Sequence, residues 1–177
     1  MEKEKEIVFG KKTLVIPSEN DKIRDIFKHV VDNDADIRYN IDGATIELVK
    51  IYPNISKTTV ARVIRTSKEL KLFSGCDLLV EFSGELWDVL NDDVKKIVME
   101  HELLHVQCKV NNKTTEVTYH LVDHDVKDFK SIIEQYGIDW FSEIQNKSIE
   151  LYPVGTDKDD DDVIKEKEKT FVKLIRL

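Results

Sequence analysis

Five consecutive residues, His101-Glu102-Leu103-Leu104-His105, constrain this chain more than any other segment. On an α-helix, residues i and i+4 lie one turn apart on the same face, so the two imidazoles can converge on one metal ion. Glu102 lies about 100° around the helix from His101, which brings its carboxylate near the metal without making it a ligand. The spacing therefore predicts a helical metal site with an acidic group beside it.

The residues around this motif predict a buried helix from Asp92 to Gln107. Asn91 and the two aspartates after it supply N-cap chemistry and early negative charge. No Pro or Gly interrupts residues 91–110, and the segment is rich in apolar residues: Val94, Ile97, Val98, Leu103, Leu104 and Val106. The H-E-x-x-H spacing on such a helix is typical of zinc-dependent peptidases, with Zn²⁺ as the cofactor and Glu102 as the general base.

A catalytic zinc site usually has three protein ligands and one open position, so a further donor is expected. The downstream candidates are Cys108, Glu116, His120, His124 and Asp125. Cys108 would lie about 10 Å along the predicted helix from His101, too far for both to bind one ion. His124 is favoured because it follows a predicted returning strand and precedes the next predicted helix. His120 and Asp125 stay open, and Asp125 can also cap that helix or orient a ligand histidine.

Periodicity predicts an α+β domain with a small mixed or antiparallel sheet packed on the motif helix and its flanking helices. Three parts are expected: an N-terminal extension over 1–55, a core over 56–140, and a C-terminal extension over 141–177 with an acidic linker. The predicted elements are a hairpin over 6–16, a helix starting at 18–21, a strand over 44–52, a helix over 58–66, a strand over 76–82, a short helix over 85–90, a strand over 115–122, a helix over 126–136 ended by Gly137, and a terminal strand over 170–177.

Composition and charge argue against several classes of protein. A net charge of −8 over 177 residues argues against a general nucleic-acid binder. No apolar run approaches the length of a transmembrane helix, and the mixed-charge N-terminus lacks the apolar core of a signal peptide. Two cysteines do not make a disulfide framework. The expectation is a cytoplasmic protein that acts on a protein or peptide substrate and has no membrane partner.

Several motifs occur in a recognisable order between Ile64 and Trp140. They are Gly75-Cys76-Asp77-Leu78-Leu79-Val80, Trp87, the His101–His105 motif, His124-Asp125, Phe129 and Tyr136-Gly137. In these motifs the chain resembles the phage metallopeptidase family. The resemblance implies a zincin-like fold, a zinc ion and peptidase activity, in the host cytoplasm if a phage encodes the chain. The spacing of His124 and Phe129 is also similar to that of Spartan-type zinc proteases, which implies that His101, His105 and His124 bind the metal.

Two other functions stay open. One is a non-enzymatic interaction or modulator protein of phage type, on a zincin scaffold with a structural zinc, in which the terminal extensions bind the partner. The other is a DNA-associated protease, which the acidic balance disfavours. For a peptidase, an extended substrate is expected along an edge strand, and Cys76 to Phe82 is the predicted edge. Tyr119, His120 and Tyr136 are candidate donors to the oxyanion.

Overall fold

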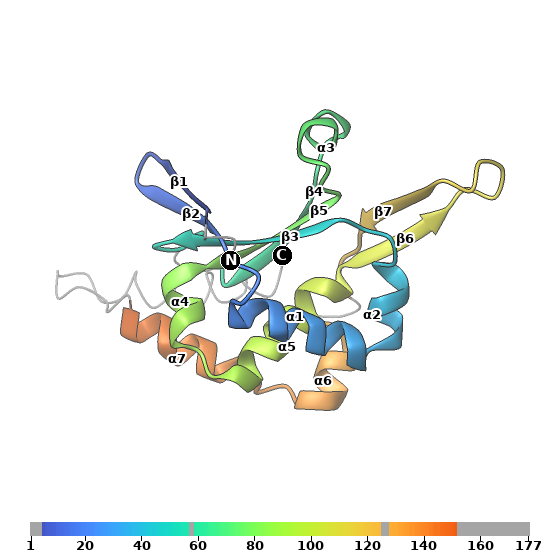
Figure 1. Cartoon of the computed structure of the whole chain (residues 1–177). Helices are drawn as coiled ribbons and strands as arrows, with labels where there is room; N and C mark the ends of the chain where they lie inside the picture. Colours follow the sequence, from blue (N-terminus) through green and yellow to red (C-terminus); the bar gives the residue numbers. More distant parts are fainter. Residues whose placement is uncertain (1–4, 57–58, 125–127, 152–177) are drawn as a thin grey trace, which may run out of the picture.

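The computed structural model describes residues 5–56, 59–124 and 128–151. These residues form an α+β domain in which most of the helices lie against one side of a mixed sheet (Figure 1). The arrangement is consistent with the small zincin-like domain that the sequence predicts. No helix among the described residues has the length and apolar character needed to cross a membrane.

The main sheet has five strands in the order β1-β2-β3-β5-β4. β3 and β5 are parallel, and the other neighbouring pairs are antiparallel. β6 and β7 form a separate antiparallel hairpin. The strands are β1 (Lys5–Phe9), β2 (Lys12–Ile16), β3 (Ile46–Tyr52), β4 (Ala61–Arg65), β5 (Leu78–Ser83), β6 (Val106–Val110) and β7 (Val117–Leu121).

Four of the helices begin after polar residues that satisfy their first amides. Asp21, Asp34, Ser67 and Asn91 each accept a hydrogen bond from a backbone N–H at the start of the helix that follows. The helices are α1 (Lys22–Asn33), α2 (Ala35–Asn40), α3 (Lys68–Ser74), α4 (Gly84–Val89), α5 (Asp92–Leu104), α6 (Lys130–Tyr136) and α7 (Ser142–Leu151). Gly137 ends α6 with a positive φ of 82°, as the sequence predicts.

Alternation along the central strands divides the sheet into two faces. Leu78, Val80 and Phe82 of β5 are fully buried with Leu48 of β3 in the main core, which α1 and α5 complete. On the other face, Val49 and Ile51 of β3 pack with Ile55 in a smaller apolar cluster. Because side chains alternate across a strand, the same segments supply both clusters. The main core therefore lies between the sheet and the motif helix.

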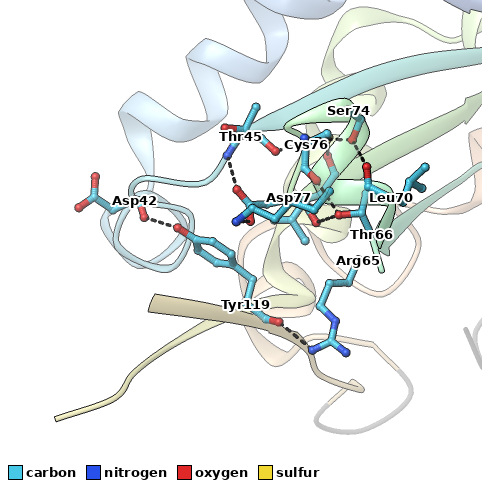
Figure 2. Close-up of polar contacts among 11 residues, drawn as sticks. Asp42, Thr45, Arg65, Thr66, Leu70, Ser74, Cys76, Asp77 and Tyr119 are labelled. Carbon is cyan, nitrogen blue, oxygen red and sulfur yellow. Dashed lines mark hydrogen bonds and ion pairs between the residues drawn. The ribbon is translucent and has the colours of Figure 1, made fainter. Parts of the chain in front are cut away.

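The β6–β7 hairpin is fixed to the rest of the domain near its base. The Tyr119 hydroxyl donates a hydrogen bond of 2.7 Å to the Asp42 carbonyl oxygen, and the Arg65 guanidinium donates one of 3.2 Å to the Tyr119 carbonyl oxygen (Figure 2). Tyr119 is buried. These contacts hold β7 against β4 and against the loop before β3, and so they fix where the chain continues after Leu121.

Three sequence predictions about local structure are wrong. Residues 61–65, predicted as part of a helix, form β4, because pairing with β5 outweighs the helix-like spacing of their apolar residues. The motif helix ends at Leu104 instead of Gln107, since the next residues pair with β7. β5, the predicted edge strand, lies between β3 and β4, so β4 is the edge. Helices α2, α3 and α7 were not predicted. The acidic linker and the terminal strand over 170–177 lie outside the described residues.

Candidate metal centre

The end of α5 and the end of the β6–β7 hairpin bring three histidines together. His101 lies in the last turn of α5, and His105 caps that helix. The backbone N–H of Val122 donates to the His105 carbonyl oxygen at 2.8 Å, directly after the pairing of Val106 with Leu121. The returning strand therefore passes beside the motif, and His124 follows two residues later.

The three imidazoles have the geometry of a metal-binding cluster. Their candidate ligand nitrogens all lie within 4.8 Å of one another, and the Nε2 atoms of His101 and His124 are 3.0 Å apart. Two nitrogens bound at about 2.0–2.1 Å in tetrahedral geometry would lie about 3.3 Å apart, so the cluster fits an ion such as Zn²⁺. Within the described residues, this is the group of histidine, cysteine and acidic side chains that can hold a metal.

The far side of two of these rings is held by other residues. His105 Nδ1 lies 2.7 Å from the Val122 carbonyl oxygen, which can only accept, so this nitrogen carries the proton. His101 Nδ1 lies 2.9 Å from a carboxylate oxygen of Asp128, and the Trp140 indole N–H donates to the other at 2.9 Å. The His105 ring therefore keeps Nε2 unprotonated and available to a metal, and Asp128 lies beside Nδ1 of His101. Such outer contacts fix the tautomer and the orientation of ligand histidines.

Burial favours the neutral forms of His105 and His124. Burial lowers the pKa of His105 below its ordinary value. For His124, burial and the nearby His101 and His105 lower the pKa to about 4. Burial would raise the pKa of Asp128, but its hydrogen bonds to His101 and Trp140 hold it below its ordinary value. Neutral imidazoles beside a carboxylate are the state that binds a cation.

Glu102 lies in the same pocket as His101 and His105. Its side chain is buried, and burial raises its pKa to about 7, although His101 and a backbone hydrogen bond from Val63 favour the charged form. A carboxyl group with a pKa near neutrality can both accept and return a proton. The backbone contact also places Glu102 against β4, the edge strand of the sheet.

The other candidates from the sequence lie elsewhere. His120 is exposed on β7, with its Nε2 3.2 Å from the Thr118 hydroxyl. Glu116 is exposed in the β6–β7 turn. Cys108 is on β6, where its backbone N–H donates to Asn40. Its exclusion as a metal ligand rests on its distance from His101 along a predicted helix, and that distance does not apply to a residue on a strand. Asp125 lies outside the described residues.

Sequence reasoning missed the acidic group that holds His101. It offered Asp125 as one candidate for such a role, whereas the described contact is made by Asp128, whose carboxylate Trp140 also binds. The position of Asp128 depends on how the segment before α6 packs on α5. Tyr136 of α6 fixes this packing by donating a hydrogen bond of 2.5 Å to the buried Glu100. No local pattern distinguishes Asp128 from the neighbouring aspartates.

A pocket of about 630 Å³ opens beside the cluster. The lining includes His101, Glu102 and His105, residues of β4, the segment from Leu121 to Asp123, and residues of α6, α7 and the loop between them. A volume of this size is typical of small-ligand and substrate sites. The arrangement combines a metal-binding cluster, a titratable carboxyl group and an accessible space in one place.

A comparison with protein-family models matches residues 17–152 to the family described as "Putative phage metallopeptidase". The chain belongs to this family. The match covers most of the chain, includes the motif helix, the β6–β7 hairpin and His124, and begins after β2. It confirms the resemblance that the sequence motifs predict and extends it on both sides, while the likeness to Spartan-type proteases stays a prediction. No curated protein and no solved structure matches the chain significantly.

Proposed function

We propose that this protein is a zinc-dependent peptidase in which His101, His105 and His124 hold the metal and Glu102 is the general base. The observation that carries the proposal is the cluster of three imidazoles whose candidate ligand nitrogens lie within 4.8 Å, with Glu102 in the same pocket. Three histidines are a known ligand set for catalytic zinc, which keeps a fourth position open.

A bound Zn²⁺ would polarise the scissile carbonyl and lower the pKa of water toward about 7. Glu102 accepts a proton from the attacking water and delivers it to the leaving amine nitrogen, so the carboxylate returns to its starting state after each turnover. Asp128 and the Val122 carbonyl oxygen keep His101 and His105 oriented throughout. The buried setting of Glu102 supports this role, because it brings the pKa near the working pH.

The substrate backbone is proposed to lie along β4. Val60 and Thr66, which flank this strand, bond to Ser83 and Asp77 on the β5 side. Because backbone groups alternate in an antiparallel pair, Ala61, Val63 and Arg65 direct theirs away from β5, and of these the Val63 N–H already bonds to Glu102. An extended peptide can pair with such an edge, and β4 also lines the pocket. β4 therefore replaces the strand that the sequence predicted for this role.

The test compares Glu102→Gln with Glu116→Gln, a matched change at an exposed glutamate. Both variants should keep about one zinc per chain, as measured by elemental analysis. Cleavage of an unfolded protein substrate should fall by a factor of about 10² to 10⁴ in Glu102→Gln, the usual contribution of a general base, and stay unchanged in Glu116→Gln. Full cleavage by Glu102→Gln, or wild-type protein that binds zinc and cleaves no peptide, would contradict the proposal. The second result would favour the non-enzymatic modulator.

A further inference from the structure

We propose that the pocket selects substrates by a large apolar side chain next to the scissile bond, and that the segment from Ile138 to Ile144 forms the selective wall. This inference rests on the proposed peptidase function and names the class of substrate for the same site. Neither the motif nor the family match specifies which side chains the protein accepts.

The first observation is the chemistry of the wall. The pocket is lined by Ile133, Ile138, Trp140, Phe141 and Ile144 from α6, α7 and the loop between them, and the Trp140 ring lies next to the metal cluster, with its centroid 5.7 Å from that of His101. The charged residues in the lining are Arg62, Glu102, Asp123 and Asp128, and most of the other lining residues are apolar. A mainly apolar space that also holds a few polar groups fits an apolar side chain next to a peptide bond.

The second observation is the exposure of this wall. Ile138 has 78 % of its surface exposed, although the neighbouring wall residue Ile144 is fully buried. Trp140 and Phe141 are partly buried and pack against the main core. Burying the exposed part of such side chains against an apolar ligand is favourable because it removes apolar surface from water. The wall is therefore anchored in the core on one side and open to a ligand on the other.

The third observation is the position of the wall relative to the reacting groups. Trp140 belongs to it, and its indole N–H binds Asp128, which contacts His101. Val63 of β4 and Glu102 line the same space. A peptide that pairs with β4 and presents its carbonyl to the metal cluster therefore places a neighbouring side chain against the apolar wall. The free volume of about 630 Å³ exceeds that of any single side chain, so a bulky residue and its backbone both fit.

The first experiment measures cleavage. Acetylated hexapeptide amides of alanine carry one guest residue, Leu, Phe, Asp or Lys, moved through each position in turn. One position flanking the cleaved bond should favour Leu and Phe over Ala by about tenfold or more in kcat/KM, since each methylene in an apolar pocket contributes a large factor. Asp at that position should be rejected. Cleavage that occurs with equal efficiency for Leu, Ala and Asp would overturn the inference while leaving the peptidase proposal intact.

A matched pair of variants locates the preference. Ile138→Asp places a charge on the wall, and Ile149→Asp makes the same change on α7 at a half-exposed residue that does not line the pocket. Both positions are exposed, so both variants should fold. Ile138→Asp should reduce the Leu-to-Ala ratio by about threefold or more, and Ile149→Asp should leave it unchanged. Equal ratios in the two variants would show that another surface makes the selection.

A binding measurement separates this inference from turnover. The chain has two tryptophans, so its ¹H–¹⁵N spectrum has two indole signals, which Trp140→Phe assigns. In Glu102→Gln, the Leu peptide should shift the Trp140 signal, and the all-alanine peptide should not. Trp87 is buried and does not line the pocket, so its signal is an internal control. A Leu-specific Trp140 shift in Glu102→Gln, with no cleavage by the wild type, would support the pocket and contradict the peptidase, whereas cleavage by the wild type without a Leu-specific shift would contradict the pocket.

Discussion

The two hairpins of this protein have similar local structure and different surroundings. β1–β2 and β6–β7 are both antiparallel pairs of five-residue strands that project from the domain (Figure 1). Every residue of β1 is exposed, including Phe9 with 80 % of its surface. In β7, Tyr119 is buried and makes the contacts that fix the hairpin to β4 and to the loop before β3. The family match includes β6–β7 and begins after β2.

The difference indicates which hairpin the site depends on. The base of β6–β7 joins α5 directly, and the chain after β7 delivers His124 to the other two histidines. β1–β2 lies at the opposite edge of the sheet from β4, which lines the pocket. Changes at the base of β6–β7 should therefore affect metal binding, and changes in β1–β2 should not.

The largest effect, a loss of zinc affinity, is expected for changes at His124, which follows β7. His124→Ala removes a proposed ligand, whereas His120→Ala removes an exposed histidine four residues earlier on the same hairpin. Zinc affinity, measured by competition with a chromogenic chelator, should fall more than about 100-fold in His124→Ala, because loss of a ligand exceeds the 10–100-fold loss seen for outer-shell changes. His120→Ala should bind zinc like the wild type. A greater loss in His120→Ala would exchange the roles of the two histidines.

A smaller effect is expected on the stability of the metal-free protein, which should depend on pH. Burial lowers the pKa of His105, and burial with its neighbours lowers that of His124 to about 4, whereas the unfolded value is about 6.5. The unfolded chain then binds more protons between these values, so stability is present above about pH 6.5 and is lost as the pH falls toward 4. Glu102 titrates in the opposite sense, because its pKa is raised to about 7.

Glu102→Gln removes the opposing contribution of Glu102 to the pH dependence of stability. The other substitutions are therefore compared in this variant. After chelation of metal, its melting temperature should fall as the pH is lowered from 6.5 to 4.5. Adding His124→Asn should make this fall smaller, and adding Phe9→Ser in β1 should leave it unchanged. If the melting temperature falls equally with pH whether or not His124 is present, this histidine is not buried in the neutral form.

The sequence predicts the reactive residues of the site better than the surfaces around them. The positions of His101, Glu102 and His105 follow from helical spacing, which is a local property. The end of α5 and the strand identity of β4 do not, because both depend on pairing with distant segments. Asp128 and the apolar pocket wall depend on how α6 and α7 pack against α5, and no periodicity in their own sequences encodes that.

Tyr119→Phe should have a moderate effect, because it removes one hydrogen bond from the base of β6–β7. The buried hydroxyl donates to the Asp42 carbonyl oxygen at 2.7 Å, and its loss should cost about 1 kcal/mol of unfolding free energy. For a chain of this size, that corresponds to a melting temperature lower by about 2–4 °C. Tyr39→Phe is the matched control at a residue with 68 % of its surface exposed, and it should melt like the wild type. Equal melting of both variants would show that the hydroxyl contributes nothing to the anchor.

The smallest effect is expected for Phe9→Ser at the end of β1. Phe9 buries little of its surface, so its replacement should change the unfolding free energy by less than about 0.5 kcal/mol, the usual range for exposed positions. Zinc content and the Leu-to-Ala cleavage ratio should also stay at wild-type values, because three strands of the sheet lie between β1 and β4, which lines the pocket. Calorimetric unfolding with and without zinc measures the unfolding free energy and the stabilisation by zinc, and the peptide assay measures the cleavage ratio. A loss of zinc affinity in Phe9→Ser would mean that β1–β2 supports the metal centre through the sheet, and the two hairpins would then differ in distance from the site but not in function.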